Sequence, residues 1–345
     1  MMAGMLRHAL WPVWAAQLAT GAKSFVDNPL IGSRRLNEAG LHVARLKLAH
    51  SMAWSRRRRL ARLIDAQDRT AFDRDGFVLK RNFLPADAFQ RLGDQIRVYR
   101  GPAREMVQGD TITRRIALDP EALAAMPEAR NVLYNRDFRG LVRYVGSYDS
   151  QPLCFIQTIL AKRYPGAEDP QVHLHADTFH PTVKAWLFLE DVAIDDGPFT
   201  YVPGSHRLTP QRIAWEQRKS LDARHAERLT ARGSFRIEPD ELAGLDLPPA
   251  ESFAVPANTL IVADTFGFHA RGVANHASTR VEIWAYGRRN PYIPWSGMDP
   301  MSLPGVSERR IGWRMWLRDR YPSWLGQPWK DVGYKNAFES DSTEP

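Results

Sequence analysis

Short apolar runs separated by turn-forming residues dominate the middle of the chain. Some alternate apolar with polar positions and others are briefly continuous, as expected for half-buried and fully buried strands. The runs cover residues 153–160, 172–178, 183–189, 199–202, 252–255, 259–263 and 281–286. Their length and spacing favour a β-sandwich or barrel over alternating strand–helix–strand units.

Helical patterns flank and interrupt these strands. Residues 72–85 predict a turn at Asp75-Gly76 and a short strand, followed by a helix that opens at Pro85 and continues to Tyr99. The charged stretch 208–247 has no strand pattern, and we interpret it as a helical insertion between two halves of the sheet system. The sequence shows no internal repeat.

The first 64 residues differ from the rest in having helical patterns and a cluster of arginines. One predicted helix places on a single face Leu6, Leu10, Val13, Trp14 and Leu18. A second helical pattern ends in four consecutive arginines, residues 56–59. We therefore divide the chain into a basic helical arm (1–64), a main domain (65–290) and an extension rich in Trp and Arg (291–345).

The net charge of the chain is concentrated in this arm. The 345 residues carry 47 Lys and Arg against 39 Asp and Glu, a net charge of +8. Residues 1–64 hold eleven of the basic residues and two of the acidic ones, so the arm carries +9 and the remainder is close to neutral. Cys154 is the single cysteine, which excludes a disulfide framework and a cysteine-based zinc cluster and favours a reducing, cytoplasmic location.

Two interpretations of the arm stay open. Its uncharged run, residues 8–22, is too short to span a hydrocarbon core of about 30 Å. The arm either packs on the main domain with its arginines in solvent, or it lies on the anionic inner face of the cytoplasmic membrane, because tryptophans and a polybasic cluster supply both signals for peripheral binding. In the second case we expect deletion of residues 1–64 to change location and not chemistry. No nucleic-acid-binding motif accompanies the charge, so nucleic acid is not an expected partner.

Candidate metal ligands occur in the run 172–177. On a strand with strict alternation, His173, His175 and Asp177 share one face. An H-x-D pair completed by a distant histidine makes a set of two imidazoles and one carboxylate, which leaves positions on Fe(II) open for a cosubstrate and O2. Without a third ligand, a surface strand with polar side chains is the simpler interpretation.

His269 is the candidate third ligand, since it follows the apolar run that begins at Leu260. Eleven residues later, Arg280 opens the alternating strand 280–286. A hairpin returning from His269 would bring the Arg280 guanidinium to the same inner face. Its planar fork suits a dicarboxylate, which it can bind in a bidentate manner.

With these residues in place, the sequence resembles the phytanoyl-CoA dioxygenase family of Fe(II)- and 2-oxoglutarate-dependent oxygenases. The resemblance covers about residues 72–289 and rests on motifs in the family's order. They are Phe72, Asp75-Gly76-Phe77-Val78 and Phe83-Leu84-Pro85; His175-x-Asp177; Ala185-Trp186; Asp196-Gly197-Pro198 with Val202-Pro203-Gly204-Ser205-His206; and His269 with Arg280.

The resemblance implies a fold, a cofactor and a reaction. The fold is mainly β with helices: a double-stranded β-helix (jelly roll) core, with the helical arm and the helical insertion added. Fe(II) is held by His175, Asp177 and His269, and Arg280 anchors the far carboxylate of 2-oxoglutarate. Oxidative decarboxylation of 2-oxoglutarate with O2 gives succinate and CO2 and is coupled to hydroxylation of an unactivated C–H bond.

The chain departs from the family pattern at two positions. Ala176 stands where the family often has Gln, and Arg271 stands where a small hydroxyl residue is common. Arg271 adds a second cation near the metal, which we expect to bind 2-oxoglutarate or an acidic substrate. Gln157 and Trp186, on the strands before and after the metal ligands, are further candidates for the 2-oxoglutarate pocket.

The arm, Arg271 and the extension help to predict the class of substrate. The tryptophans and arginines of the extension either pack at the domain edge or form a basic, aromatic wall over the site. We expect an anionic, membrane-associated small molecule or lipid-linked sugar, and the resemblance extends loosely to bacterial hydroxylases of the 3-deoxy-octulosonate (Kdo) sugar of lipopolysaccharide. Alternatives are an acyl-CoA or secondary-metabolite hydroxylase and a jelly-roll binding protein without catalysis. Nothing in the sequence predicts the oligomeric state.

Overall fold

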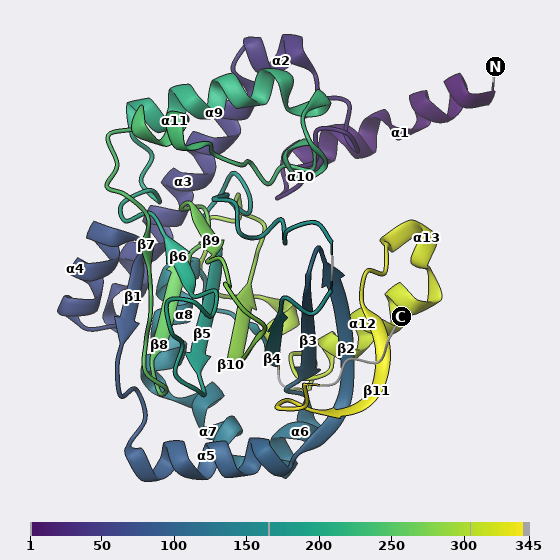
Figure 1. Cartoon of the computed structure of the whole chain (residues 1–345). Helices are drawn as coiled ribbons and strands as arrows, with labels where there is room; N and C mark the ends of the chain where they lie inside the picture. The colour runs from purple at the N-terminus through teal and green to yellow at the C-terminus, as the bar shows by residue number, and fades with distance from the viewer. Residues whose placement is uncertain (1, 165, 304, 341–345) are drawn as a thin grey trace.

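An antiparallel sheet of eight strands forms the centre of the part of the chain that the computed structural model describes, residues 2–164, 166–303 and 305–340 (Figure 1). In spatial order the strands are β1 (Phe77–Lys80), β8 (Leu260–Asp264), β5 (Val183–Phe188), β10 (Ser278–Gly287), β4 (Leu153–Ala161), β3 (Thr111–Ala117), β2 (Arg100–Gln108) and β11 (Lys330–Asn336). A second antiparallel sheet consists of β7 (Glu251–Ser252), β6 (Phe199–Tyr201) and β9 (His269–Arg271). The jelly-roll prediction is confirmed, but helices hold more residues than strands, so the architecture is mixed instead of mainly β.

The large sheet divides its side chains between two environments, because successive residues of a strand point to opposite faces. On β10, Val281 and Ile283 lie in the main hydrophobic core, whereas Arg280 and Trp284 point to the opposite face and line a cavity. Helices cover the core face: α4 (Ala66–Asp75), α5 (Ala86–Val98), α6 (Pro120–Ala125), α7 (Pro127–Tyr134) and α8 (Arg136–Gly146). One face of the sheet is therefore sealed, and the other is free for function.

Two strand predictions are wrong around the metal ligands. The run 172–178 is not a regular strand, since His175 makes only isolated bridges to Arg236 and His269 within the described residues. His173 does not share the face of the other two ligands, and its side chain is 64% exposed. The predicted hairpin is also absent, because β9 pairs with β6 in the small sheet while β10 pairs with β4 and β5 in the large one. The chain crosses between the sheets, and the cavity lies between them.

The N-terminal arm contains α1 (Met2–Leu18), α2 (Arg34–Glu38), α3 (Leu41–Leu60) and the short 3-10 helix η1 (Ala61–Leu63). Three apolar side chains of α3 are fully buried, namely Leu46, Ala49 and Ala53. Both interpretations of the arm left its arginine cluster outside the fold, and this is wrong for Arg56 and Arg57, which are 4% and 1% exposed. None of the helices in the described part of the chain is long and apolar enough to cross a bilayer.

The insertion is helical, as predicted, and covers the arm. It contains α9 (Pro210–Asp222), the 3-10 helix η2 (Ala223–His225), α10 (Arg228–Ala231) and α11 (Pro239–Ala243). Glu216 of α9 accepts hydrogen bonds from Arg212 and contacts His42 Nε2 of α3 at 2.8 Å, all three side chains being buried. Arm and insertion therefore fold against each other above the sheets, as Figure 1 shows.

The extension returns to the sheet. It contains the 3-10 helix η3 (Pro300–Ser302), α12 (Arg310–Arg320) and α13 (Pro322–Leu325), and it ends on β11. Strand β11 pairs with β2 at the edge of the large sheet, which the sequence pattern did not predict. Consequently α12 lies along the open face of the sheet, where Ile311, Arg314 and Arg318 line the cavity.

Candidate active site

A cavity of about 400 Å³ lies between the two sheets. The strands β3, β4, β5 and β10 of the large sheet, β9 of the small sheet and α12 contribute to its lining. Its charged and histidine lining residues are Lys23, Arg115, His175, Asp177, Lys184, His269, Arg271, Arg280, Arg288, Arg314 and Arg318. The structure thus brings together all seven predicted site residues, because Gln157 and Trp186 line the same cavity.

Two histidines form the centre of the site. The backbone N–H of His175 donates to the carbonyl of His269, and the N–H of His269 donates to the carbonyl of His175, both at 3.0 Å. This pairing sets the two side chains next to each other, with ring centroids 4.5 Å apart. A single antiparallel bridge, and not a strand, therefore positions both imidazoles.

Asp177 completes the group. Its backbone N–H donates to the carbonyl of Thr265 at 2.9 Å, so the segment that leads to His269 also fixes the carboxylate. The Oδ1 atom lies 3.8 Å from Nε2 of His175 and 3.7 Å from Nε2 of His269. One candidate ligand atom from each of the three residues lies within 4.8 Å of the other two.

Both imidazoles are held in the form that a metal requires. Nδ1 of His175 contacts the carbonyl of His173 at 2.8 Å, and Nδ1 of His269 contacts the carbonyl of Gly267 at 2.9 Å. A carbonyl accepts only from a protonated Nδ1, which leaves the Nε2 lone pair free toward the cavity. Burial lowers the pKa of His269 to about 4 and holds the pKa of His175 well below its usual value, so both rings are neutral at pH 7.

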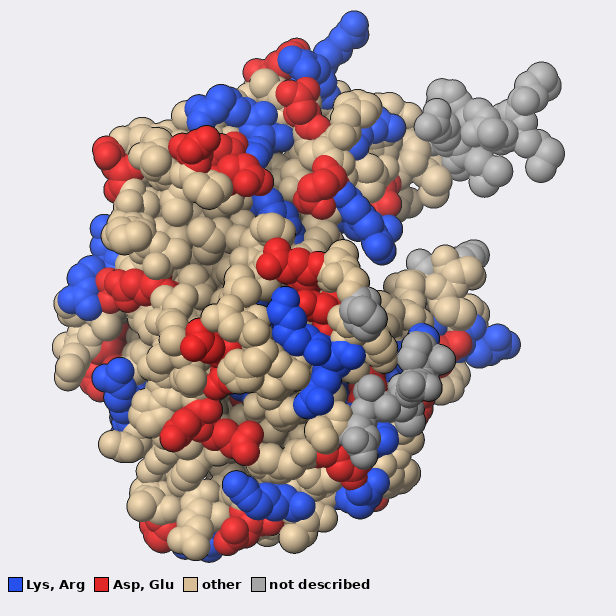
Figure 2. Space-filling model, viewed as in Figure 1, with Lys and Arg blue, Asp and Glu red and all other residues tan. Residues whose placement is uncertain are grey.

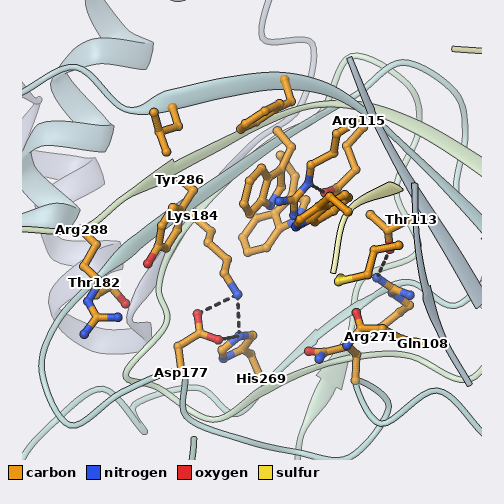
Figure 3. Close-up of a pocket in the computed structure, with 18 of the residues that line it drawn as sticks. Gln108, Thr113, Arg115, Asp177, Thr182, Lys184, His269, Arg271, Tyr286 and Arg288 are labelled. Atoms are coloured by element: carbon orange, nitrogen blue, oxygen red, sulfur yellow. Dashed lines mark hydrogen bonds and ion pairs between the residues drawn. The ribbon is translucent and has the colours of Figure 1, made fainter. Parts of the chain in front are cut away.

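The ammonium group of Lys184 lies beside two of the candidate metal ligands. Its Nζ lies 2.6 Å from Oδ2 of Asp177 and 3.5 Å from Nε2 of His269, as Figure 3 shows. Burial alone raises the pKa of Asp177, but Lys184 and the two histidines outweigh burial and hold that pKa well below its usual range. The donor set is an ionised carboxylate and two neutral imidazoles beside a bound ammonium group. It fits Fe(II) with open positions.

Arg280 is present at the predicted place, but part of its guanidinium is already occupied. Nε donates to Oε2 of Glu282 at 3.0 Å, and Nη1 donates to the carbonyl of Gly197. The arginine is 6% exposed and Glu282 is fully buried. The pair holds the guanidinium rigidly against the cavity, and Nη2 is the nitrogen without a partner among the described residues.

Arg271 also reaches the cavity and carries its own carboxylate. Nη1 bonds to Oδ2 of the buried Asp169, and Nη2 donates to Oγ1 of Thr113 at 3.4 Å. Burial lowers the pKa of Arg271, and the nearby positive charge of Arg280 acts in the same direction. Two arginines thus flank one region of the cavity, each neutralised by a buried acid.

Gln157 and Trp186 have different environments. Gln157 links two charged side chains, since it accepts from Nε of Arg115 at 2.7 Å and donates to Oε1 of Glu282 at 2.6 Å. Trp186 packs against Phe199 of the small sheet, with ring centroids 4.4 Å apart. The first belongs to a polar network in the cavity wall, and the second closes the cavity between the sheets.

Sequence reasoning missed five charged residues at the site, which are Lys23, Arg115, Lys184, Glu282 and Arg288. Lys184 had a usable signal, because it is two positions before Trp186 on an alternating strand and must share its face. Glu282 could have been found in the same way, because it lies two positions after Arg280 on an alternating strand and must share its face. Lys23 and Arg115 had no such signal, since they come from the arm and from an unpredicted strand.

Lys23 ties the arm to the site. Its Nζ donates to the backbone carbonyl of Asp177, and burial lowers its pKa to about 8. The arm therefore contributes one side chain to the cavity, and the effect of deleting residues 1–64 on turnover stays a prediction.

Residues 72–239 match the sequence profile described as phytanoyl-CoA dioxygenase. The match covers His175 and Asp177 and ends before His269 and Arg280, which the fold supplies. No curated protein sequence matches the chain.

Solved structures with a similar fold include iron- and 2-oxoglutarate-binding enzymes. The epimerase SnoN, in complex with Fe3+, alpha ketoglutarate and nogalamycin RO, is 18% identical at a TM-score of 0.42, covering 66% of this chain and 83% of SnoN. HygX from Streptomyces hygroscopicus, with nickel, 2-oxoglutarate and hygromycin B bound, is 14% identical at a TM-score of 0.41, covering 70% and 93% of the two chains. EctD from S. alaskensis, with bound Fe, is 17% identical at a TM-score of 0.38, covering 71% and 85%.

Proposed function

We propose that this chain, whose residues 72–239 match the phytanoyl-CoA dioxygenase profile, is an Fe(II)/2-oxoglutarate-dependent dioxygenase that acts on an anionic substrate. The enzyme inserts one oxygen atom into an unactivated C–H bond of an anionic, membrane-associated molecule, such as the Kdo sugar of lipopolysaccharide. One observation carries the proposal: eight Lys and Arg side chains line the described cavity, and Asp177 is the single acid among the lining residues. A site with that balance attracts an anion and repels a cation.

The residues of the cavity divide the work. His175, Asp177 and His269 would hold Fe(II), and the free Nη2 of Arg280 would bind the far carboxylate of 2-oxoglutarate. Bound iron, 2-oxoglutarate and O2 supply the oxidising chemistry that attacks an unactivated C–H bond. Lys184 keeps the outer oxygen of Asp177 occupied, so that Oδ1 stays turned toward both histidines. Trp186 and Phe199 exclude water from the space between the sheets.

A larger chamber of about 930 Å³ adjoins the cavity and gives the substrate a way in. The two spaces share Tyr286, Arg288, Arg314 and Arg318 among their lining residues. Arm and extension form opposite walls of this chamber, and Figure 2 shows the hollow between the helical part at the top and the C-terminal segment at the right. The chamber has room for a substrate much larger than a free sugar.

The exposed hydrophobic side chains of α1 and of the extension support a location at the cytoplasmic face of the membrane. Of the 21 large hydrophobic side chains that are exposed among the described residues, twelve lie on α1 or in the segment 295–325. Leu10, Trp11 and Val13 on α1 are 43%, 49% and 50% exposed. The chain just after α1 meets the end of the main domain, since Asn290 donates to the carbonyl of Ala19 at 3.1 Å. Exposed aromatic and aliphatic side chains around a basic opening suit an anionic lipid surface.

The enzyme class is tested on purified protein. With Fe(II), it should convert 2-oxoglutarate to succinate slowly without a substrate. His175→Ala, Asp177→Ala and His269→Ala should each lose bound iron and this turnover, whereas the exposed His225→Ala should keep both. Turnover near wild type in any of the three variants would overturn the assignment of the ligands.

The substrate is tested by mass spectrometry of lipid A and its inner core from cells with and without the gene. We expect Kdo to carry one additional oxygen atom only when the gene is present. An unchanged Kdo mass would reject this sugar, and the acyl-CoA and secondary-metabolite alternatives would then be assayed by succinate release.

The membrane location is tested by flotation with anionic vesicles at low and high salt. Full-length protein should float at low salt and less at high salt, because exposed charges are screened over about 8 Å at physiological ionic strength. The combined variant Leu10→Ser, Trp11→Ser and Val13→Ser should float less, and Val98→Ser, exposed on α5, serves as the matched control. Absence of flotation at low salt would remove the membrane from the proposal.

A further inference from the structure

Arg115 is a cavity cation held between aromatic rings. Its guanidinium carbon lies 3.8 Å from the ring centroid of Trp284 and 4.5 Å from that of Trp329. Phe155 adds a third ring at 5.4 Å. Figure 3 shows Arg115 beside a group of aromatic rings. Cation–π contacts on a guanidinium fix its plane, so the side chain loses little further freedom when it binds a ligand.

The polar contacts of Arg115 are few. Nε donates to Oε1 of Gln157 at 2.7 Å. Within the described part of the chain, neither terminal nitrogen donates a hydrogen bond to the protein, and none of the carboxylates lies within 4.0 Å of the guanidinium. Both terminal nitrogens therefore have donors to offer, and Arg115 lines the cavity that holds the candidate metal ligands.

The neighbouring arginines differ in this respect. Arg280 is paired with Glu282, and Arg271 is paired with Asp169. Arg115 is the deep arginine whose charge the described residues leave without an ion pair. Burial lowers its pKa to about 9, Glu282 opposes this shift, and the positive charges of Arg271 and Arg314 add to it. An anion bound at Arg115 would relieve this unfavourable field.

We propose that Arg115 anchors a second anion subsite, which binds a carboxylate or phosphate group of the substrate while Arg280 holds 2-oxoglutarate. The inference rests on the proposed function, since it names the part of an anionic substrate that the cavity grips. Two oxygens of a carboxylate or a phosphate can each accept from one of the two terminal nitrogens of a fixed guanidinium, and such paired, charge-assisted bonds are strong. The bound anion would be either the carboxylate of the octulosonate sugar or a phosphate group of a lipid.

The tryptophans that hold Arg115 provide the readout. The full-length enzyme, loaded with Fe(II) and saturated with 2-oxoglutarate without oxygen, is titrated with inorganic phosphate and separately with acetate while tryptophan fluorescence is followed. We expect a saturable change with at least one of the two probes, and the more effective probe identifies the source. Arg115→Gln should weaken the half-saturation at least tenfold, Arg115→Lys should lie between, and Arg81→Gln, exposed at the end of β1, should match wild type.

A second measurement needs no variant. Wild-type enzyme is treated with phenylglyoxal, which modifies arginines, with and without the effective anion, and the labelled peptides are mapped by mass spectrometry. Arg115 should be protected by the anion. Equal labelling of Arg115 in both samples, or a half-saturation that Arg115→Gln leaves unchanged, would overturn the inference.

Succinate formation is measured on the same preparations, which separates the two proposals. An enzyme that turns over 2-oxoglutarate but responds to anions independently of Arg115 rejects this subsite alone. A chain that binds the anion through Arg115 but does not turn over 2-oxoglutarate rejects the enzyme assignment and leaves the subsite standing.

Discussion

Two groups of arginines, one at the end of α3 and one lining the cavity, differ in how many hydrogen bonds the fold gives to some of their members. Arg56 donates to the carbonyls of Ser147, Pro291 and Ile293 at 2.7–2.9 Å, and to the hydroxyl of Ser147. Arg57 lies beside it and is equally well bonded. In the cavity, Arg115 has one protein hydrogen bond among the described residues, through Nε.

Arg57 shows what the bonds of the first group achieve. Nη2 donates to Asp264 Oδ2 at 2.7 Å, and Asp264 Oδ1 accepts from the backbone N–H groups of Thr182 and Phe266. Burial raises the pKa of Asp264, and Arg57 opposes this effect. Since Phe266 belongs to the segment that leads to His269, the arm supports the geometry of the site from behind.

The difference teaches that unused donors, more than burial or local sequence, distinguish an arginine that binds a ligand from one that holds the fold. A saturated guanidinium must break bonds before it can bind anything else. A clamped guanidinium with free N–H groups is organised for binding before the ligand arrives. The four predictions below test this distinction.

Arg57→Met should have the largest effect on stability. It leaves Asp264 buried without its cation, and breaking one side of a buried ion pair removes about 3–5 kcal/mol of unfolding free energy. Urea unfolding followed by circular dichroism measures the loss. A decrease below about 1 kcal/mol would show that Arg57 is not a structural arginine, and the comparison would fail.

Arg280→Lys should weaken 2-oxoglutarate binding by about 1.5–3 kcal/mol while iron content stays near wild type. An ammonium group cannot hold Glu282, Gly197 and a ligand carboxylate with the same fixed geometry. Anaerobic calorimetry with Fe(II)-loaded protein gives the affinity, and Arg271→Lys is the matched comparison. If the affinity falls with Arg271→Lys and not with Arg280→Lys, then Arg271 is the anchor.

Acid should destabilise the interior that surrounds Arg57. The pKa of His50 is lowered to about 3, first by burial and then by the charges of Arg57 and Arg212. An unfolded histidine has a pKa of about 6.5, so the unfolded chain binds this proton below pH 6.5 and the folded chain does not. The contribution is complete above pH 6.5 and declines by about 1.4 kcal/mol per pH unit as the pH falls toward 3.

The measurement compares urea unfolding at pH 7.5, 6.0 and 5.0 for wild type, His50→Leu and the exposed His225→Leu. His50→Leu should be less sensitive to acid by the stated slope, and His225→Leu should follow wild type. Equal slopes in wild type and His50→Leu would mean that His50 takes up its proton in the folded protein.

Arg58→Met should have the smallest effect, within about 0.5 kcal/mol of unfolding free energy. Arg58 adjoins Arg57 in the sequence but is exposed. It is the matched control for Arg57→Met in the same unfolding experiment. A loss as large as that of Arg57→Met would show that the whole cluster acts together and that individual contacts do not separate its members.

The local sequence pattern was enough to predict many of the strands and helices and the four residues proposed for the centre of the site. Strands β4, β5, β8 and β10 and helix α5 follow their apolar periodicities closely, because a strand or helix that buries one face must repeat apolar residues at its own period. His175, Asp177, His269 and Arg280 were identified because the chemistry of iron and of a dicarboxylate allows few residue types, and these occur in short motifs. The alternation of apolar and polar residues wrongly predicted a regular strand at 172–178. There, isolated β-bridges of His175 fix the chain in place of a continuous ladder.

The sequence by itself predicted the reaction class and the four residues proposed for its centre, and it showed the concentration of charge in the arm. Only the tertiary structure decided which charges are used by the fold and which face the cavity. Arg115 meets Trp329 and Lys23 meets Asp177 although each pair is far apart in the sequence. Such contacts depend on strand register and helix docking between distant segments. A local pattern records the polarity of each position, but the partner of a charged group is set by what the folded chain brings beside it.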